Sequence, residues 1–600
     1  MSAGWWSHSA PAGDRRRYWR ACGLCLLAAL ALPCGACVQM VRQTDQDVAR
    51  LIEARQRAAL GRAVTADVGM PDRLPRPARS AYNRNPSPTT EDVPASFAAA
   101  SQPTTAAVES TAAPPPVPTT RPPGVFTLTA ALAYAQRHQR EYQSAKEDLY
   151  LAALALTVER HLWTPIFAAN LRTVYGNYGE ATDFDQAMRF AADVAVTQRL
   201  PYGGEFTAGA VSTLIRDVKK TITASEGSSA ELGLKVPFLR GAGHIAQETL
   251  IQLERELTYS VRVFERFRRQ QLVTVAQAYF NLLAVKQRVA DSEESYQNFV
   301  MDFERAADME SIGRGTPLDT QRAEGAMLNQ ENALEAAREN FRASADNFKL
   351  LIGMPVDESL EREDLEDIET IERQIADGRY PLLTRPGAVN DEQGATAVAL
   401  RRRLDLLTLA DRIDDARRGV AISRNALLPD LNWDSSLALE TDPAHYRLGG
   451  FRFDRANWRS EIVLGLPLER TQERADLRRS LIDVQQAQRT YQEQTDRIRA
   501  QVRAAVHGLI LQERSLEIQR KSVEVAERQR EFAQIQYEDG TIDNRDKIDA
   551  ENAWVSARNQ LNLAKTDRWG ALLEFRLATE TLRIEDDGTQ LPDDADASAP

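Results

Sequence analysis

The feature that most restricts the fold is a pair of very long segments without helix-breaking residues. Residues 244–312 contain neither Gly nor Pro, and residues 468–539 contain only Gly508. At about 1.5 Å per residue, each segment would form a helix about 100 Å long. Apolar residues recur in both mainly at steps of three and four, as on one face of a helix: Leu253, Leu257, Val261, Phe264, Leu272, Val275, Tyr279, Leu282, Val285 and Val289 in the first, and Leu481, Val484, Tyr491, Ile498, Val502, Ala505 and Leu509 in the second. Such a narrow stripe needs neighbours of equal length, from the same chain or from copies of it.

Shorter segments before these helices alternate apolar and polar residues with the two-residue period of a β-strand. The apolar residues of one face are Leu431, Trp433, Leu437 and Leu439 in "LNWDSSLALE", Ile462, Leu464 and Leu466 in "EIVLGLPL", and Phe167, Leu171, Tyr175, Leu232, Leu234, Val236 and Phe238 nearer the N-terminus. Strands of about ten residues with this pattern match the wall of an outer-membrane barrel. An ordinary half-buried sheet has the same period and stays open as the alternative.

This order of elements occurs twice, between about residues 125 and 584. Each half opens with a predicted helix of about thirty residues that stops at a proline, Pro165 or Pro429. Strands, a long helix, a turn and a further helix follow. The first half has the longer strand region, and its surplus "VAVTQRLPYGGEFTAGAV" predicts an additional hairpin that turns at residues 201–204.

Each long helix runs into a turn motif, and the two motifs match each other. "GRGTPLDTQRAE" begins at Gly313 and "GTIDNRDKIDAE" at Gly540, and Asp319 aligns with Asp546 without a gap. Glycine permits the left-handed conformation that ends a helix, and a carboxylate is favoured at the start of the next helix. Alone, the first motif resembles an active-site loop. Two copies in one chain favour a pair of equivalent helical hairpin turns.

The N-terminus has the pattern of an export signal. A basic region is followed by the short apolar core "ACGLCLLAALAL", which is too short for a stable membrane anchor. Small residues precede Cys37, which is therefore predicted to be the lipidated first residue of a lipoprotein. Ordinary cleavage is the alternative, because Cys34 stands where such signals usually have leucine.

Residues 38–124 are poor in large apolar side chains and dense in Pro, Thr and Ala. We expect them to bury too little surface to fold, and we interpret their later part as a flexible tether. The chain ends in an acidic tail that is expected to be disordered.

Charge and motif content argue against several classes of function. The formal net charge is −12, and no basic cluster follows the signal, so no nucleic-acid partner is expected. The cysteines all lie at or before Cys37, and the histidines are scattered without ligand spacing. Gly241 and Gly243 imitate a dinucleotide-binding fingerprint, but the long helix after them leaves no room for the next parallel strand; they ease the passage from strand to helix instead. We predict no enzyme activity, catalytic residue, cofactor or metal site.

The repeated order of helix, strands, long helix and Gly-x5-Asp-x3-Ala turn in an exported chain resembles the TolC-like outer-membrane efflux proteins. The resemblance covers about residues 125–584, and its strongest pieces are "RRLDLLTLA", "LLPDL", "VPFLRGAG" and the two turn motifs. It implies an α+β membrane protein, a homotrimer in which twelve strands, four per chain, close one transmembrane β-barrel. The long helices would form a coiled-coil barrel through the periplasm.

The resemblance also implies a function, a location and partners. The chain would be the outer-membrane exit duct of a tripartite efflux or type I secretion system. Its partners would be a periplasmic adaptor (membrane fusion) protein, an inner-membrane transporter and outer-membrane lipid. The rival hypothesis is a lipid-anchored coiled-coil tether or adaptor without a pore, which would not explain the two sets of strands.

Particular residues receive roles from the same resemblance. Gly313 and Gly540 would mark the periplasmic tip turns, and Asp546 and Asp549 match acidic positions that face the pore at its closed end. Three copies of these carboxylates would form negative rings that favour cations. Alternatively, they are helix-start and solvated carboxylates.

Asp319 and Tyr537 match tip contacts that link neighbouring coils in that family. Two departures stand beside them. The second half lacks a counterpart of the Gly241 and Gly243 pair, and Asp543 and Arg545 do not follow the family pattern.

These features divide the chain as follows: signal peptide, 1–36; lipid-anchored segment and disordered linker, 37–124; first repeat, 125–360; inter-repeat linker, 361–390; second repeat, 391–584; acidic tail, 585–600.

Overall fold

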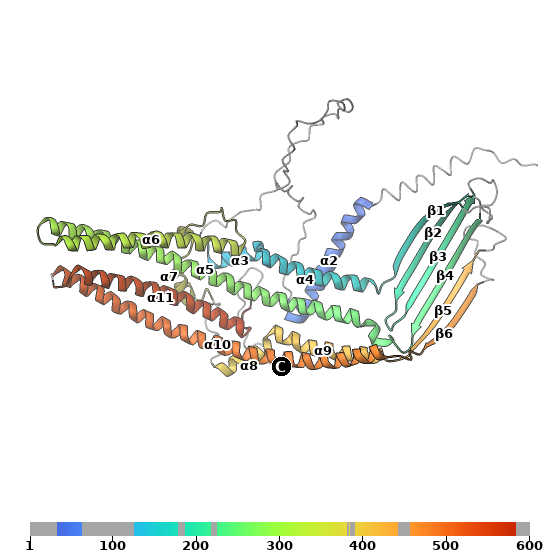
Figure 1. The fold of residues 1–600 in the computed structure, drawn as a ribbon. Coiled ribbons are helices and arrows are strands. Elements are labelled where there is room, and N and C mark those ends of the chain that lie inside the picture. The colour runs from blue at the N-terminus through green and yellow to red at the C-terminus, as the bar shows by residue number, and fades with distance from the viewer. Residues whose placement is uncertain are drawn as a thin grey trace, which may run out of the picture.

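The computed structural model describes residues 33–62, 125–177, 186–217, 225–380, 383, 391–441, 456–539 and 541–583. The body is elongated, with one β-sheet at one end and two helix–helix turns at the other (Figure 1). The helices are α2 (Pro33–Leu60), α3 (Leu128–His138), α4 (Arg140–His161), α5 (Glu248–Ser311), α6 (Pro317–Ile352), α7 (Ile368–Ala376), α8 (Glu392–Arg402), α9 (Leu404–Asn425), α10 (Thr471–Glu538) and α11 (Asn544–Ala578), with short 3₁₀-helices η3 (Gly243–Gln247) and η4 (Arg362–Asp364). The strands are β1 (Ile166–Asn177), β2 (Gln186–Arg199), β3 (Glu205–Asp217), β4 (Ser225–Pro237), β5 (Asp430–Glu440) and β6 (Asn457–Gly465).

The two long helices predicted from the sequence are confirmed. Helix α5 has 64 residues and α10 has 68, so each is about 100 Å long at 1.5 Å per residue. Near the turns α5 pairs with α6 and α10 with α11, whereas near the sheet α5 pairs with α4 and α10 with α9. Long helices are therefore covered along their length by pairs of shorter ones.

The single helices expected before Pro165 and Pro429 are wrong, because each is broken at one residue. Gln139 separates α3 from α4, and Arg403 separates α8 from α9, both with extended backbone. The end of α6 lies against the first break, where a Cβ at Gly353 would be 2.3 Å from the His138 carbonyl oxygen. The second break holds a buried guanidinium, with Arg403 donating to Gln501 Oε1 at 2.7 Å. Tertiary contacts thus interrupt both helices.

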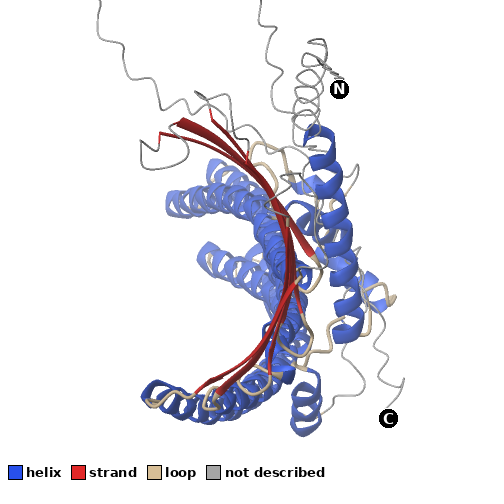
Figure 2. Cartoon of the chain, turned by 90° about the vertical axis from the view of Figure 1, so that its right-hand side faces the viewer, coloured by secondary structure: helices blue, strands red, loops and turns tan. Residues whose placement is uncertain are grey.

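The expectation that residues 38–124 do not fold is wrong for residues 38–60, which belong to α2. Val48 and Ile52 are buried against α4 and α5, and Arg55 pairs with Glu254 at 2.9 Å. Composition averaged over the whole segment hid this short amphipathic stretch. Figure 2 shows α2 on the convex side of the curve that the sheet and helices follow. Residues 63–124, the rest of the expected tether, lie outside the described residues, as does the acidic tail.

All six strands form one antiparallel sheet in sequential order. The hairpin predicted at residues 201–204 is confirmed, because Gly203 N–H donates to the Leu200 carbonyl and Leu200 N–H to the Gly204 carbonyl. This hairpin, β2–β3, makes the implied four strands per chain wrong. The sheet is strongly curved, and the helices follow the same curve (Figure 2).

The largest apolar core lies in the middle of the body, where α3, α5, α6 and α11 meet. Phe280 and Trp569 contact each other with ring centroids 5.1 Å apart. Tyr279 is fully buried, and its hydroxyl donates to the Phe126 carbonyl at 2.8 Å. This core fixes the start of the first half onto the long helix.

Within the described ranges, we find no helix with a stretch long and apolar enough to cross a membrane.

Candidate functional site

One face of the sheet is apolar across all six strands. Phe167 lies opposite Val196, and Leu437 lies opposite both Leu232 and Trp458, so apolar side chains continue from strand to strand. The exposed side chains of this face include Phe167, Leu171, Tyr175, Val194, Leu232, Trp458, Ile462 and Leu464. Phe167 and Ile462 keep 75% and 70% of their surface exposed, far more than a soluble sheet leaves open for residues of this size.

The opposite face carries most of the charged side chains of the sheet. Near the helices, Glu205 lies opposite Lys235, Lys235 opposite Asp434, and Asp434 opposite Glu461. These residues line a hollow of about 340 Å³. The sheet thus separates an apolar surface from a polar one, in the alternation typical of a barrel wall between lipid and water.

At the other end of the body, the first turn connects α5 to α6 around Gly313. Gly313 has φ 71°, and the next amide, that of Arg314, donates to the Met309 carbonyl at 2.9 Å, as in a helix C-terminal cap. The Thr316 hydroxyl donates to Asp319 Oδ2 at 2.6 Å at the start of α6. The side chain of Asp319 therefore serves its own helix start.

The second turn connects α10 to α11. Gly540 lies outside the described residues, so its role in this turn stays a prediction. Asp546 and Asp549 are both exposed on the first turns of α11. Asp549 is 3.8 Å from Arg545, with both side chains largely in solvent, and such a pair contributes little to stability.

The two turns are joined by contacts that sequence reasoning missed. Lys547 of α11 forms an ion pair with Asp302 of α5, and both side chains are nearly buried. The same ammonium lies 5.1 Å from the centroid of the Tyr537 ring. Burial, and then the nearby carboxylates of Asp302 and Asp319, raise the pKa of Tyr537. Tyr537 is thus placed between the two hairpins.

Further contacts surround this junction. Arg305 pairs with Glu538 at 3.3 Å, and Asn544 Nδ2 donates to the Asp319 carbonyl at 3.4 Å. A hollow of about 630 Å³ opens beside them between α5, α10 and α11. The Asp319 contact to the second hairpin therefore runs through its backbone.

One helical turn beyond Lys547 in α11, Glu551 is buried between α5 and α10. It accepts a hydrogen bond from Asn298 Nδ2 at 3.1 Å and lies 3.8 Å from Arg530, whose guanidinium covers the Trp554 ring at 3.9 Å. Burial raises the pKa of this carboxyl above its ordinary value. Nothing in the local sequence distinguishes Glu551 from the many solvated glutamates of this chain.

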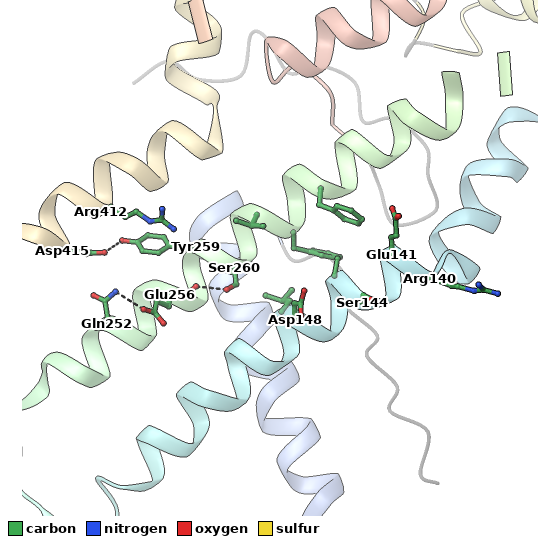
Figure 3. Close-up of a pocket in the computed structure, with 15 residues that line it drawn as sticks. Arg140, Glu141, Ser144, Asp148, Gln252, Glu256, Tyr259, Ser260, Arg412 and Asp415 are labelled. Atoms are coloured by element: carbon green, nitrogen blue, oxygen red, sulfur yellow. Dashed lines mark hydrogen bonds between the residues drawn. The ribbon is translucent and has the colours of Figure 1, made fainter. Parts of the chain in front are cut away.

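A groove of about 890 Å³ lies between α4, α5 and α9 (Figure 3). Phe264 and Phe267 line it together with charged side chains. Tyr259 donates to Asp415 Oδ2 at 2.6 Å, and burial together with this bond raises the pKa of Tyr259 to about 12. Among the described residues, no cluster of metal-ligating side chains is present.

Cys37 lies in the second turn of α2. Its lipidation stays a prediction, as do the pore-facing roles of Asp546 and Asp549.

This chain has a curved two-faced sheet on long paired helices, a fold that solved outer-membrane channels share. It is similar to the CmeC channel of Campylobacter jejuni, with 14% identity, a TM-score of 0.54 and coverage of 77% of this chain and 86% of that one. It is also similar to VceC of Vibrio cholerae, at 14% identity, TM-score 0.55 and coverage of 75% and 95%. It is similar, too, to the open-state MtrE channel of Neisseria gonorrhoeae, with 14% identity, a TM-score of 0.54 and coverage of 76% of this chain and 89% of that one.

A comparison of the sequence with protein families agrees with this likeness. The profile of the outer membrane efflux protein family matches residues 396–579, from α8 to the end of α11. The resemblance to TolC-like outer-membrane efflux proteins is therefore confirmed. No curated protein sequence matches the chain.

Proposed function

We propose that this chain is the outer-membrane exit duct of a tripartite efflux or type I secretion system. Three copies close a transmembrane β-barrel with their sheets and a periplasmic tunnel with their helices. Substrate enters at the turns around Gly313 and Gly540 from an inner-membrane transporter and its periplasmic adaptor. It leaves through the barrel.

The observation that carries this proposal is the two-faced sheet. Its apolar face suits lipid and its charged face suits a water-filled lumen. Even the indole groups on the apolar face are satisfied within the sheet, since Trp433 donates to Ser460 Oγ at 3.0 Å and Trp458 to Ser435 Oγ at 3.2 Å. Hydrocarbon offers no other partner for such groups. A poreless tether has no use for this arrangement.

Assembly from several copies is supported by a second apolar surface, on α10. Leu511, Ile518, Val525 and Phe532 are spaced by one heptad each, and all are more than half exposed. A sustained heptad of apolar residues is the pattern of a coiled-coil seam. α10 follows β6, the last strand of the sheet. We infer that this stripe packs against the next copy.

The test of assembly is Leu511→Glu combined with Phe532→Glu, which places two charges in the seam. The detergent-corrected mass of the purified full chain is expected to fall from three copies to one. Gln512→Glu adds a charge on the same helix beside the stripe and should leave the trimer intact. Retention of three copies in the double variant would refute the seam.

The test of the channel is reconstitution of the purified protein in planar bilayers. Discrete conductance steps and a mass of three chains are expected. An absence of steps, together with any other mass, would contradict the proposal.

The proposed pore-facing role of Asp546 and Asp549 is tested by ion selectivity. Replacing Asp546 and Asp549 with Ala should lower the preference for cations, read from reversal potentials in a salt gradient. Asp483→Ala with Asp496→Ala removes two exposed carboxylates of α10 remote from the turn and should not. Equal selectivity in both double variants would show that Asp546 and Asp549 do not line the pore and are helix-start or solvated carboxylates instead.

The lipid anchor is proposed at Cys37, at the start of the helix that packs on the outside of the body. Mass spectrometry of the mature N-terminal peptide should find an acylated cysteine. An unacylated N-terminus produced by cleavage at another position would exclude the anchor.

A further inference from the structure

The β2–β3 hairpin is a full part of the wall. β2 pairs with β1 from Gln186 to Thr197 and with β3 from Ala187 to Arg199, and β3 pairs in turn with β4. Both faces continue through it. Val194 lies between Ala169 and Ala210 on the apolar face. Next to it, Asp193 accepts from Asn170 Nδ2 at 2.7 Å on the polar face.

The turn of this hairpin is built into the junction between sheet and helices. Gly203 and Gly204 have φ 93° and 98°, and a Cβ at Gly204 would be 2.2 Å from the Lys235 carbonyl oxygen. The Tyr202 carbonyl accepts from Gly243 N–H at 2.8 Å, and the Pro201 carbonyl from Gln247 Nε2 at 2.7 Å. The turn therefore packs against the link from β4 to α5.

The same packing accounts for a difference between the two halves. Gly241 and Gly243 have φ 78° and 74°, and a Cβ at Gly203 would be 2.8 Å from the Gly241 carbonyl oxygen. Among the described residues, no hairpin turn packs against the link from β6 to α10, and this link has no glycine pair. The glycines thus belong to the docking of the additional hairpin.

The additional hairpin also matches the width of the sheet to that of the helices. At the sheet end each copy contributes α4, α5, α9 and α10, which at about 8–10 Å per helix occupy about 32–40 Å of circumference. Strands about 4.8 Å apart and tilted by about 40° occupy about 38 Å when there are six, and only about 25 Å when there are four. With six strands, the sheet and the helices of each copy therefore occupy about the same circumference.

From these observations we propose that the barrel wall is six strands wide in every copy, so that three copies enclose eighteen strands. This rests on the proposed trimeric channel. The backbone diameter is then about 36 Å, against about 24 Å for twelve strands at the same tilt. The barrel is as wide as the tunnel behind it and admits bulkier cargo than a twelve-stranded exit does.

The first test measures the bore from the barrel side. Neutral polyethylene glycols of increasing size are added there to single trimers in planar bilayers, and the largest polymer that lowers the conductance is recorded. The comparison protein lacks residues 186–225, so that Glu226 takes the place of Gln186 and the apolar residues of β4 stay on the apolar face. The full chain should admit polymers of a radius at least about 1.5 times larger, because side chains narrow both bores by the same width. Equal cut-offs would overturn the proposal.

The second test keeps the chain intact and does not depend on the deletion variant folding. Val194→Cys and Asp193→Cys are labelled with a fluorophore in the full-length protein in vesicles, with the unsubstituted chain as background. Nitroxide-labelled lipid should quench the probe at position 194 several-fold more than at position 193. Equal quenching at the two positions places β2 outside the wall and overturns the proposal.

The outcomes separate the two levels of inference. Trimers that conduct but show equal cut-offs or equal quenching overturn the wide barrel alone. A protein that neither conducts nor forms trimers overturns the channel, and the eighteen-stranded closure with it, whereas alternating quenching would still show the hairpin in a lipid-facing sheet.

Discussion

The ion pair between Lys547 and Asp302 is the contact at the tip whose removal should have the largest effect. Lys547 keeps 9% of its side chain exposed and Asp302 16%, and the pair joins α11 of one hairpin to α5 of the other. Lys547→Met keeps the length and apolar stem of the side chain but removes the charge. Asp302 is then left nearly buried without its cation.

The size of the effect follows from the burial of the pair. Removing one partner of a fully buried pair costs about 3–5 kcal/mol, whereas an exposed pair contributes about 0–1 kcal/mol. The residual exposure of both partners lowers the first figure, and we expect a loss of about 2–3 kcal/mol. At about 1.4 kcal/mol for each factor of ten, local opening of the tip becomes about 30- to 150-fold more frequent.

Hydrogen exchange of the backbone amides in α6 and the first turns of α11 measures this opening directly. The matched control is Lys521→Met, because Lys521 pairs with Glu517 on α10 with 73% and 62% of the side chains exposed. The control should change exchange less than about 5-fold. If Lys547→Met changes tip exchange no more than the control does, the pair does not hold the hairpins together.

The double substitution Lys547→Met with Asp302→Asn completes the cycle. It removes the uncompensated carboxylate as well as the cation, so the tip should recover most of the lost protection. An additive loss would show that the two residues act through other contacts.

Three further predictions concern the turn, the outer helix and pH. Gly204→Ala should lower the free energy of unfolding by about 2 kcal/mol or more, because of its positive φ and the contact with Lys235, whereas Gly508→Ala within α10 should be neutral or stabilising. Ile52→Ala should expose α2 to limited proteolysis, at a cost of about 2–5 kcal/mol in docking, unlike the exposed Glu53→Ala. The pKa of Glu551 is raised in the folded state, so the folded protein binds this proton more readily than the unfolded chain does. Its contribution to stability is therefore present below the ordinary value of 4.5 and is lost as pH rises through the folded pKa; Glu551→Gln should remove this part of the pH dependence in thermal unfolding, and an unchanged profile would contradict the assignment.

The long helices and the strands could be predicted because each depends on a local pattern. The absence of Gly and Pro and the steps of three and four define α5 and α10. Alternation of apolar and polar residues around Trp433 and Ile462 indicates β5 and β6. The breaks at Gln139 and Arg403 could not be predicted, because contacts with α6 and α10 create them.

The tip shows the same division. The turn at Gly313 was found because its motif is repeated, and its left-handed backbone follows from glycine chemistry. The pair of Lys547 with Asp302 spans 245 positions. Each residue on its own has the pattern of a solvated helix face, so only the fold brings them together.

A series of ion pairs between α5 and α9 fixes the axial register of the two halves of the chain. The pairs run in opposite directions along the two helices: Arg255 with Asp415, Arg262 with Asp411, and Arg266 with Asp405. A slip of one helical turn, about 5.4 Å, would separate all of them. Partly buried pairs of this kind add little net stability, because desolvation offsets their attraction. Their effect is on register, since β4 leads into α5 and α9 leads into β5, and the series therefore holds Leu232 opposite Leu437, where the two halves of the sheet join.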